Sequence, residues 1–183
     1  MFTSVILGAG KSTRMKANKS KLLFNIAGKP VINHILSSLK ASKAKHNICV
    51  INNSSAELIK ILQAEKISFA YQKILDGTAG AVKAALKSKK NSNSKILILC
   101  GDVPFITSSS IKKLVAKLKN HDAVVGTVEL ESPKGYGRIV RVNNKFSSIV
   151  EEKETTPDER QIREVNTGTV SYTHLTLPTI CSV

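Results

Sequence analysis

The chain alternates between short apolar runs and longer segments in which apolar residues recur every three or four positions. The short runs predict buried strands at residues 3–7, 47–51, 67–71, 95–100 and 123–128. The segments with helical periodicity cover residues 30–40, 56–65, 79–88 and 109–119. Strands that alternate with helices predict an α/β fold, built on a Rossmann-like, doubly wound and mainly parallel sheet.

One segment departs from this alternation. Residues 135–149 begin with Gly-Tyr-Gly-Arg and continue with an alternating run from Ile139 to Val142, which is followed by Asn143 and Asn144. Asparagine tolerates the positive φ angles that a tight hairpin turn requires. We therefore expect a small antiparallel excursion from the parallel sheet.

A glycine-rich turn follows the first predicted strand. Residues 7–15 read Leu-Gly-Ala-Gly-Lys-Ser-Thr-Arg-Met. Glycines let backbone N–H groups approach an anion, and the side chains of Arg14 and Lys21 can neutralise charge on phosphoryl oxygens. Ligands of such sheets bind beyond the carboxyl ends of the strands, where this turn, Gln72 and Asp102 fall. The turn therefore indicates nucleotide chemistry, although an ordinary strand-to-helix turn has similar features.

The same turn partly matches a Walker A loop. Residues 10–13 read Gly-Lys-Ser-Thr, like the end of that motif, but Val5 stands where the motif needs its first glycine. A P-loop phosphotransferase therefore stays open as an alternative.

A carboxylate follows the predicted strand at residues 95–100. Asp102 comes directly after Gly101, at the edge of the expected sheet. Mg²⁺ takes oxygen ligands and needs only one or two protein carboxylates when phosphates supply the others. Asp102 is thus a candidate metal ligand, and the alternative is a turn aspartate that precedes Pro104.

Four motifs together resemble those of the sugar-1-phosphate nucleotidyltransferases. They are the glycine-rich loop with the later Lys21, then residues 101–104 (Gly-Asp-Val-Pro), 135–138 (Gly-Tyr-Gly-Arg) and 164–168 (Glu-Val-Asn-Thr-Gly). Their order and spacing resemble the N-terminal domain of the bacterial N-acetylglucosamine-1-phosphate uridyltransferases, from about Ser4 to about Thr169. Two positions depart from the family: Gly8 replaces a usual alanine and Ser12 a usual glycine. A side chain at Ser12 would crowd the phosphates.

The resemblance implies the nucleotide-diphospho-sugar transferase fold and a reaction. UMP would pass from UTP to N-acetylglucosamine 1-phosphate, giving UDP-N-acetylglucosamine and pyrophosphate for peptidoglycan and lipopolysaccharide synthesis in the cytoplasm. Another sugar-1-phosphate nucleotidyltransferase is the nearest alternative. The family's homotrimer is expected only with a further C-terminal part.

The resemblance also implies site residues. The catalytic residues would be Arg14, Lys21 and Asp102, with Mg²⁺ on Asp102. The nucleotide would contact Leu7, Gly8, Ala9, Gly10, Lys21, Gln72, Gly77, Thr78, Cys100, Gly101 and Asp102. The sugar would contact Gly137, Glu151 and Asn166, and the adjacent Glu152 would face away if this segment is extended. Gln72, Gly77 and Thr78 match the family's uracil-binding stretch, and a glutamine amide can pair with uracil through a donor and an acceptor together.

The net charge of +15 raises nucleic-acid binding as a further alternative. The lysines are scattered, however, and aromatic residues are scarce, so we expect solvated helix faces and no nucleic-acid partner. No apolar run is long enough to span a membrane and no signal peptide is visible, so we expect a cytoplasmic enzyme. Cys49 and Cys100 end apolar runs and are expected to be small core residues.

Residues 170–183 contain no Asp, Glu, Lys or Arg, although 41 such residues, 28 basic and 13 acidic, precede them. Back-translation of residues 170–179 gives a string that resembles a transposon-end adapter used in sequencing libraries. We therefore expect a nucleotidyltransferase domain at 1–169, incomplete at its C-terminus, and a non-native tail at 170–183. The alternative is a native terminal strand, because residues 170–177 include β-forming side chains.

Overall fold

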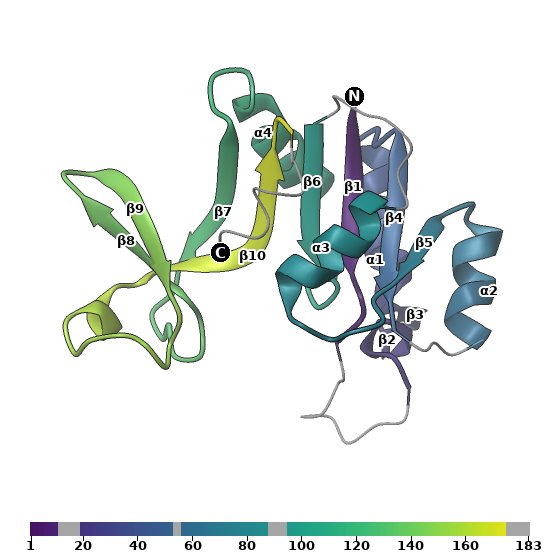
Figure 1. Cartoon of the computed structure of the whole chain (residues 1–183), viewed down its shortest axis with the longest axis horizontal. Helices are drawn as coiled ribbons and strands as arrows, with labels where there is room; N and C mark the ends of the chain where they lie inside the picture. The colour runs from purple at the N-terminus through teal and green to yellow at the C-terminus, as the bar shows by residue number, and fades with distance from the viewer. Residues whose placement is uncertain (11–18, 53–55, 88–94, 175–183) are drawn as a thin grey trace. The chain divides into compact units, whose positions relative to one another are not determined.

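The computed structural model describes residues 1–10, 19–52, 56–87 and 95–174 (Figure 1). The chain divides into two compact units. The first comprises Met1–Val124 together with Ser171–Val183, and the second comprises Val125–Val170.

The first unit is built on a parallel sheet. Its strands are β1 (Phe2–Leu7), β4 (His46–Ile51), β5 (Ser68–Tyr71) and β6 (Lys95–Cys100), in the order β5-β4-β1-β6 (Figure 1). Strand β1 pairs in parallel with β4 and with β6, and β4 pairs in parallel with β5. The helices are α1 (Val31–Ala41), α2 (Ala56–Ala64), α3 (Thr78–Lys87) and α4 (Ser108–Lys117). The predicted doubly wound α/β fold is confirmed, and each of these boundaries lies within two residues of its prediction.

Side chains of the parallel strands alternate between two core clusters. Cys49 and Ile51 of β4 belong to a cluster with residues of α1, α2 and α4. Ile48 and Val50 of the same strand belong to a second cluster, which includes Val82 of α3. Both faces of the sheet are therefore covered, which explains why its strands read as continuous apolar runs.

The second unit is antiparallel. Strand β8 (Arg138–Val142) pairs with β9 (Lys145–Val150) and with β10 (Glu164–Tyr172) in antiparallel directions. Strand β7 (Ala123–Glu129) also pairs with β10. It forms where a buried strand was expected, but none of its residues is buried. Asn143 and Asn144 have φ angles of 50° and 62°, as the tight turn between β8 and β9 requires. The predicted antiparallel excursion is confirmed.

Strand β10 runs past the boundary that we expected at residue 169. Residues 170–172 belong to this strand, and the side chain of Ser171 is fully buried. The uncharged segment therefore begins as a regular strand, whatever its origin, and the expected foreign origin stays a prediction. Residues 175–183 lie outside the described residues.

Three small elements lie before α1. The 3₁₀ helix η2 (Lys21–Leu23) is followed by a two-stranded sheet of β2 (Asn25–Ile26) and β3 (Lys29–Pro30). A further 3₁₀ helix, η3 (Glu159–Gln161), lies in the second unit. None of the helices in the described part of the chain combines the length and the apolar character that a membrane crossing needs.

Candidate functional site

A cavity of about 480 Å³ lies at the carboxyl ends of β1, β5 and β6, beside the start of α3. It is lined by Leu7, Ala9, Gly10, Lys21, Gln72, Leu75, Gly77, Thr78, Ala81, Cys100 and Asp102. Nine of the eleven residues that we expected at the nucleotide are in this set, and Leu75 and Ala81 are additional. The carboxyl ends of parallel strands meet at one edge of a sheet, so residues far apart in the chain converge there.

Gly8 and Gly101 complete the predicted nucleotide set but do not line the cavity. A Cβ on Gly8 would lie 2.5 Å from Leu22 Cδ1, and a Cβ on Gly101 would lie 2.7 Å from the carbonyl oxygen of Leu7. Both glycines also donate backbone hydrogen bonds to neighbouring strands, Gly8 to Val50 and Gly101 to Leu7. The two glycines therefore let the chain pack closely beneath the cavity, and Gly8 in place of alanine leaves room for Leu22.

Lys21 is brought to the cavity by the buried residues that follow it. Leu22 and Leu23 are buried in the core, and the Ser20 hydroxyl accepts a hydrogen bond from the backbone N–H of Leu22 at the start of η2. The Lys21 ammonium donates to Asp102 Oδ2 at 2.9 Å. The Asp102 side chain, directly beyond β6, is 62% exposed. Two of the three predicted catalytic residues are thus in direct contact. Arg14, the third, lies outside the described residues, as does Ser12.

Cys100 is half-buried and lines the same cavity. Burial raises the pKa of its thiol above the ordinary value, the charge of Asp102 raises it further, and the charge of Lys21 lowers it. Burial raises the pKa of Cys49 to about 12. Both cysteines are free thiols. Cys49 lies in the core as expected, whereas Cys100 belongs to neither core cluster and lies at the cavity instead. Among the described residues, no group of three or more His, Cys, Asp or Glu side chains is arranged to hold a metal ion.

The buried side chain of Gln72 is held by two acceptors at the start of α3. Its Nε2 lies 2.9 Å from Asp76 Oδ1 and 3.0 Å from the carbonyl oxygen of Gly77. Gly77 has a φ of 94°, which favours glycine at this turn. Asp76 was not among the site residues expected from the sequence. The Asp-Gly pair immediately before a helical segment was the available signal, because an aspartate in a turn often accepts hydrogen bonds from groups of that same turn.

The three predicted sugar residues lie together in the second unit. The backbone N–H of Asn166 donates to the carbonyl oxygen of Gly137 at 2.9 Å. A Cβ on Gly137 would lie 3.3 Å from Glu151 Oε1. The Asn166 side-chain oxygen accepts from the backbone N–H of Gly168. The backbone hydrogen bond between Asn166 of β10 and Gly137, together with the close approach of Glu151 just after β9, therefore groups a backbone carbonyl, a carboxylate and an amide.

Glu152 binds Arg138 and the backbone of Gly135, two contacts that the sequence did not indicate. Its carboxylate accepts the backbone N–H of Gly135 at 3.0 Å and lies 2.8 Å from Nη1 of Arg138, which is 2% exposed. Arg138 also donates to the carbonyl oxygen of Tyr136. The hydrogen bond from Gly135, together with Arg138, holds the pKa of Glu152 below its ordinary value. Glu152 stands in a turn, so the alternation expected for an extended segment does not apply to it.

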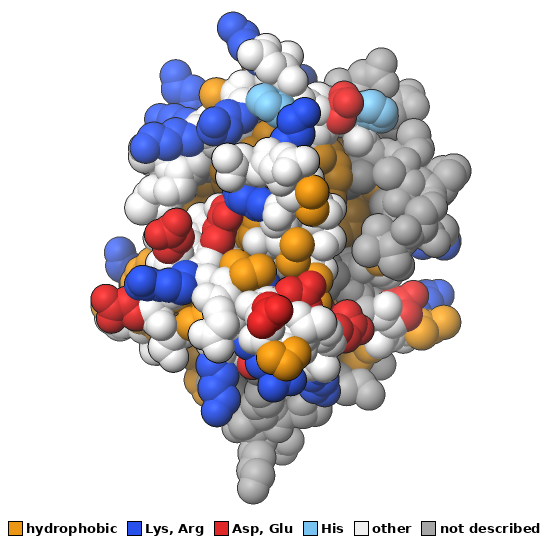
Figure 2. All heavy atoms as spheres, turned by 90° about the vertical axis from the view of Figure 1, so that its left-hand side faces the viewer, with side chains coloured by type: hydrophobic (Ala, Val, Ile, Leu, Met, Phe, Trp, Pro, Cys, Tyr) orange, Lys and Arg blue, Asp and Glu red, His pale blue; other side chains and the backbone are white. Residues whose placement is uncertain are grey.

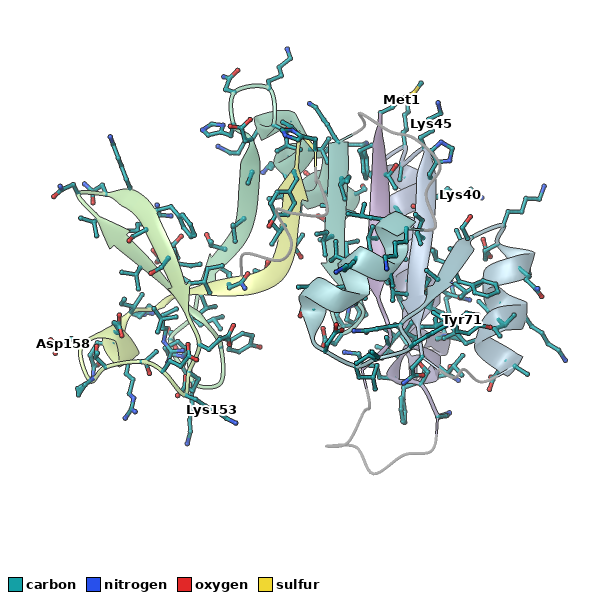
Figure 3. All side chains as sticks on the ribbon, in the orientation of Figure 1. Met1, Lys40, Lys45, Tyr71, Lys153 and Asp158 are labelled. Atoms are coloured by element: carbon teal, nitrogen blue, oxygen red, sulfur yellow. The ribbon has the colours of Figure 1, made fainter. Side chains whose placement is uncertain are left out.

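A larger cavity, of about 610 Å³, occurs elsewhere in the first unit. Its lining includes Met1, Lys43, Lys45, Lys95, Lys112 and Lys119. Figure 3 shows Met1 and Lys45 at the end of the sheet where β1 begins. Because ligands of open α/β sheets bind at the carboxyl ends of the strands, we assign the candidate site to the smaller cavity.

Basic side chains are distributed over the surface rather than gathered in one patch on the face shown in Figure 2. On that face, lysines and arginines form several groups with acidic side chains among them (Figure 2). This distribution agrees with the interpretation of the lysines as solvated surface residues.

The chain resembles one protein family over most of its length and is related to several curated proteins. Residues 4–156 match the model of the MobA-like NTP transferase domain. The bifunctional protein GlmU of Buchnera aphidicola subsp. Baizongia pistaciae (strain Bp) is 39% identical over 174 residues, which cover 93% of this chain and 38% of that protein. The bifunctional protein GlmU of Herminiimonas arsenicoxydans is 39% identical over 167 residues, 91% of this chain and 36% of that protein. The chain thus spans less than half the length of these curated relatives, and the predicted family resemblance is confirmed.

Solved structures share the fold at lower identity. A putative glucose-1-phosphate thymidylyltransferase from Bacillus anthracis matches with a TM-score of 0.77 and 22% identity, over 94% of this chain and 71% of that one. HddC from Yersinia pseudotuberculosis, complexed with GMP-PN, matches with a TM-score of 0.75 and 24% identity, over 100% and 80%. A UDP-glucose pyrophosphorylase complexed with UDP-glucose matches with a TM-score of 0.73 and 16% identity, over 94% and 76%. These similarities confirm the predicted nucleotide-sugar transferase fold.

Proposed function

The chain belongs to the family of MobA-like NTP transferase domains, and we propose that it transfers UMP from UTP to N-acetylglucosamine 1-phosphate. The observation that carries the proposal is the cavity at the carboxyl edge of the parallel sheet, which collects nine residues of the expected nucleotide site. The product would be UDP-N-acetylglucosamine, a building block for cell-envelope polysaccharides. The family match supports nucleotidyl transfer, and the choice of UTP and of N-acetylglucosamine 1-phosphate is our proposal.

The proposed reaction is an in-line displacement at phosphorus. A phosphate oxygen of the sugar phosphate forms a bond to the α-phosphorus of UTP, and the bond from that phosphorus to the pyrophosphate oxygen breaks. The attacking oxygen is already anionic at neutral pH, so the reaction needs no strong general base. The protein then has two tasks, to position the reactants and to stabilise charge on the phosphoryl oxygens. Lys21 lines the cavity and carries the positive charge for the second task. Arg14 shares that task in our proposal.

Asp102 fits a magnesium ion by the chemistry of its side chain. It offers hard oxygen donors at the cavity, and its side chain is 62% exposed. Its ion-pair partner Lys21 has a long, flexible side chain, so a bound phosphate can attract the Lys21 ammonium away from Asp102. One carboxylate is enough when the phosphates supply further oxygens. When bound there, the ion would neutralise phosphate charge. Asp102 would hold the ion, and Lys21 would be left free to contact the phosphoryl oxygens.

The second unit supplies the proposed sugar residues. The Glu151 carboxylate can accept hydrogen bonds from sugar hydroxyls, the Asn166 amide can both donate and accept, and Gly137 offers its backbone. Gly137 lies just before β8, Glu151 just after β9 and Asn166 within β10, and this grouping supports one recognition surface for the sugar.

A pyrophosphate-release assay tests the proposal. The chain is incubated with UTP and Mg²⁺, with and without N-acetylglucosamine 1-phosphate, and with ATP, GTP or dTTP in place of UTP. We expect release that requires both UTP and the sugar phosphate. Calorimetric titration of the same chain with UTP measures binding separately from turnover.

Other outcomes would identify the alternatives. Hydrolysis of ATP or GTP without a sugar phosphate would favour a P-loop phosphotransferase. Turnover with a different sugar phosphate would keep nucleotidyl transfer and change the acceptor. Salt-sensitive binding of DNA or RNA without nucleotide turnover would favour a nucleic-acid module.

Asp102→Asn is the matched variant for the pyrophosphate-release assay, because it removes one charge from the cavity and keeps the side-chain shape.

A further inference from the structure

Both hydrogens of the Gln72 amide nitrogen are already in use. Nε2 donates to the carboxylate of Asp76 at 2.9 Å and to the carbonyl oxygen of Gly77 at 3.0 Å. An amide NH₂ group has two hydrogens to donate. Gln72 therefore has no further side-chain donor for a ligand in this arrangement.

The orientation of this amide follows from the chemistry of its two neighbours. A carboxylate and a backbone carbonyl only accept hydrogen bonds. The opposite orientation would place the amide oxygen against two acceptors, so Asp76 and Gly77 together hold the nitrogen on their side. Gln72 lines the cavity, and within the described residues no donor reaches its Oε1. The oxygen is then the polar atom that this side chain offers to a ligand.

The Asp76 carboxylate lies against Gly80, one turn into α3. A Cβ on Gly80 would lie 1.6 Å from Asp76 Oδ1 and 2.3 Å from Asp76 Cγ. These distances are far below van der Waals contact, so the carboxylate reaches Gln72 only because residue 80 has no side chain. Asp76 itself is exposed, so its carboxylate is free to swing into solvent when the space at Gly80 is filled.

We propose that Asp76 is a positioning residue that fixes Gln72 as a hydrogen-bond acceptor and thereby selects uracil over cytosine. The inference rests on the proposed function, because it takes this cavity as the site of the base. Uracil carries a hydrogen on N3, which an amide oxygen accepts, whereas N3 of cytosine is itself an acceptor. A fixed oxygen at that position therefore binds uracil and repels cytosine. Gln72 then reads the base through one acceptor, and not through the donor–acceptor pair suggested by the sequence.

Two variants remove the Asp76 contact in different ways. Asp76→Ala deletes the carboxylate. Gly80→Ala keeps the carboxylate but fills the space that it needs, and alanine favours a helix more than glycine does, so this variant stays folded. In both variants Gln72 loses one of the two acceptors that orient it, and its amide can turn to donate to N3 of cytosine.

The experiment measures the affinities of UTP and CTP for the 183-residue chain by calorimetric titration. Wild type should prefer UTP. We expect each variant to lower the ratio of UTP affinity to CTP affinity by about tenfold, the usual effect of one hydrogen bond. The double variant Asp76→Ala, Gly80→Ala should equal Asp76→Ala alone, because both changes act on one contact. Glu57→Ala is the control: Glu57 lies in the first turn of α2, outside the cavity, so the same charge is lost and the ratio should not change.

The outcomes separate this inference from the proposed function. An unchanged affinity ratio in both variants, with wild type preferring UTP, would overturn the role of Asp76 and leave the proposed function intact. Equal losses of UTP and CTP affinity would also overturn it, because a structural or purely electrostatic role acts on both nucleotides alike. A wild-type chain that does not prefer UTP would overturn the proposed function and this inference with it.

Discussion

Lys21 and Asp102 form an ion pair with 2.9 Å between Nζ and Oδ2, although they are 81 positions apart in the chain. The pair lies at the cavity, where each side chain neutralises the charge of the other. A nucleotide triphosphate brings negative charge that competes with Asp102 for Lys21. The effect of Asp102 on nucleotide binding therefore depends on whether a divalent cation is present.

Asp102→Asn should act in opposite directions with and without Mg²⁺. Without the metal, the change removes a negative charge from the cavity and frees Lys21, so we expect UTP to bind about fivefold more tightly, a modest gain because Asp102 is exposed. With Mg²⁺, we expect pyrophosphate release to fall by about 100-fold or more, because the ligand for the ion loses its charge. Titration in a chelator and the release assay measure the two effects. Near-normal turnover would rule out the metal role of Asp102.

The thiol of Cys100 should report the charges of its two neighbours. Its raised pKa keeps the thiol neutral near pH 7, so alkylation by iodoacetamide should be slow there and accelerate as the pH rises. Asp102 raises this pKa and Lys21 lowers it, so Asp102→Asn should speed alkylation and Lys21→Met should slow it at the same pH. Mass spectrometry of the peptide that contains Cys100 gives the rates.

Cys49 is the internal control for this measurement. Its pKa is about 12 and its side chain is fully buried, so it should stay unmodified in all of these proteins. Equal Cys100 rates in wild type, Asp102→Asn and Lys21→Met would contradict the arrangement of the three side chains. UTP should protect Cys100, because this residue lines the proposed nucleotide cavity.

Two glycines near the cavity should respond differently to alanine. A Cβ on Gly101 would meet the backbone oxygen of Leu7 at 2.7 Å, so Gly101→Ala should cost about 2 kcal/mol of unfolding free energy through overpacking. A Cβ on Gly10 meets no atom of the described residues within 4 Å, so Gly10→Ala should leave the melting temperature nearly unchanged and weaken UTP binding. Denaturant unfolding and UTP titration of both variants make the comparison. Equal stability of the two variants would show that Gly101 is not needed for packing.

The pair of Arg138 and Glu152 should make the protein sensitive to acid. The pKa of Glu152 is lowered in the folded protein, so its stabilising contribution is complete above its ordinary value of 4.5 and disappears as the pH falls through the lowered pKa. Glu152→Gln leaves the buried Arg138 without a charged partner. We expect its melting temperature to be several degrees below that of wild type at pH 7, and the difference to vanish at strongly acidic pH.

Glu151→Gln provides the comparison for that experiment. It removes one negative charge from the residue next to Glu152 and leaves Glu152, the partner of Arg138, unchanged. Its melting temperature should stay close to that of wild type at every pH. A similar loss of stability in both variants would assign the effect to net charge and not to the ion pair.

Much of the fold followed from local patterns in the sequence. Short apolar runs predicted β1, β4, β5, β6 and β7, and helical periodicity predicted the four α-helices. The pair Asn143–Asn144 predicted the turn of the hairpin because its residues tolerate a positive φ. These features depend on neighbouring residues, so the order of residues was sufficient to find them. The parallel order of strands also placed Gly10, Gln72 and Asp102 at one edge of the sheet.

Contacts between distant side chains were decided only by the tertiary structure. The sequence suggested Lys21 and Asp102 as separate catalytic residues, and their ion pair exists because η2 is anchored in the core by Leu22 and Leu23. The family resemblance implied that Gly101 contacts the nucleotide, whereas its close approach to the backbone of Leu7 explains why no side chain fits there. The buried Arg138 and its partner Glu152 gave no periodic signal at all. Residue order determines which elements form, but distances between side chains depend on how those elements pack, and only the folded chain contains that information.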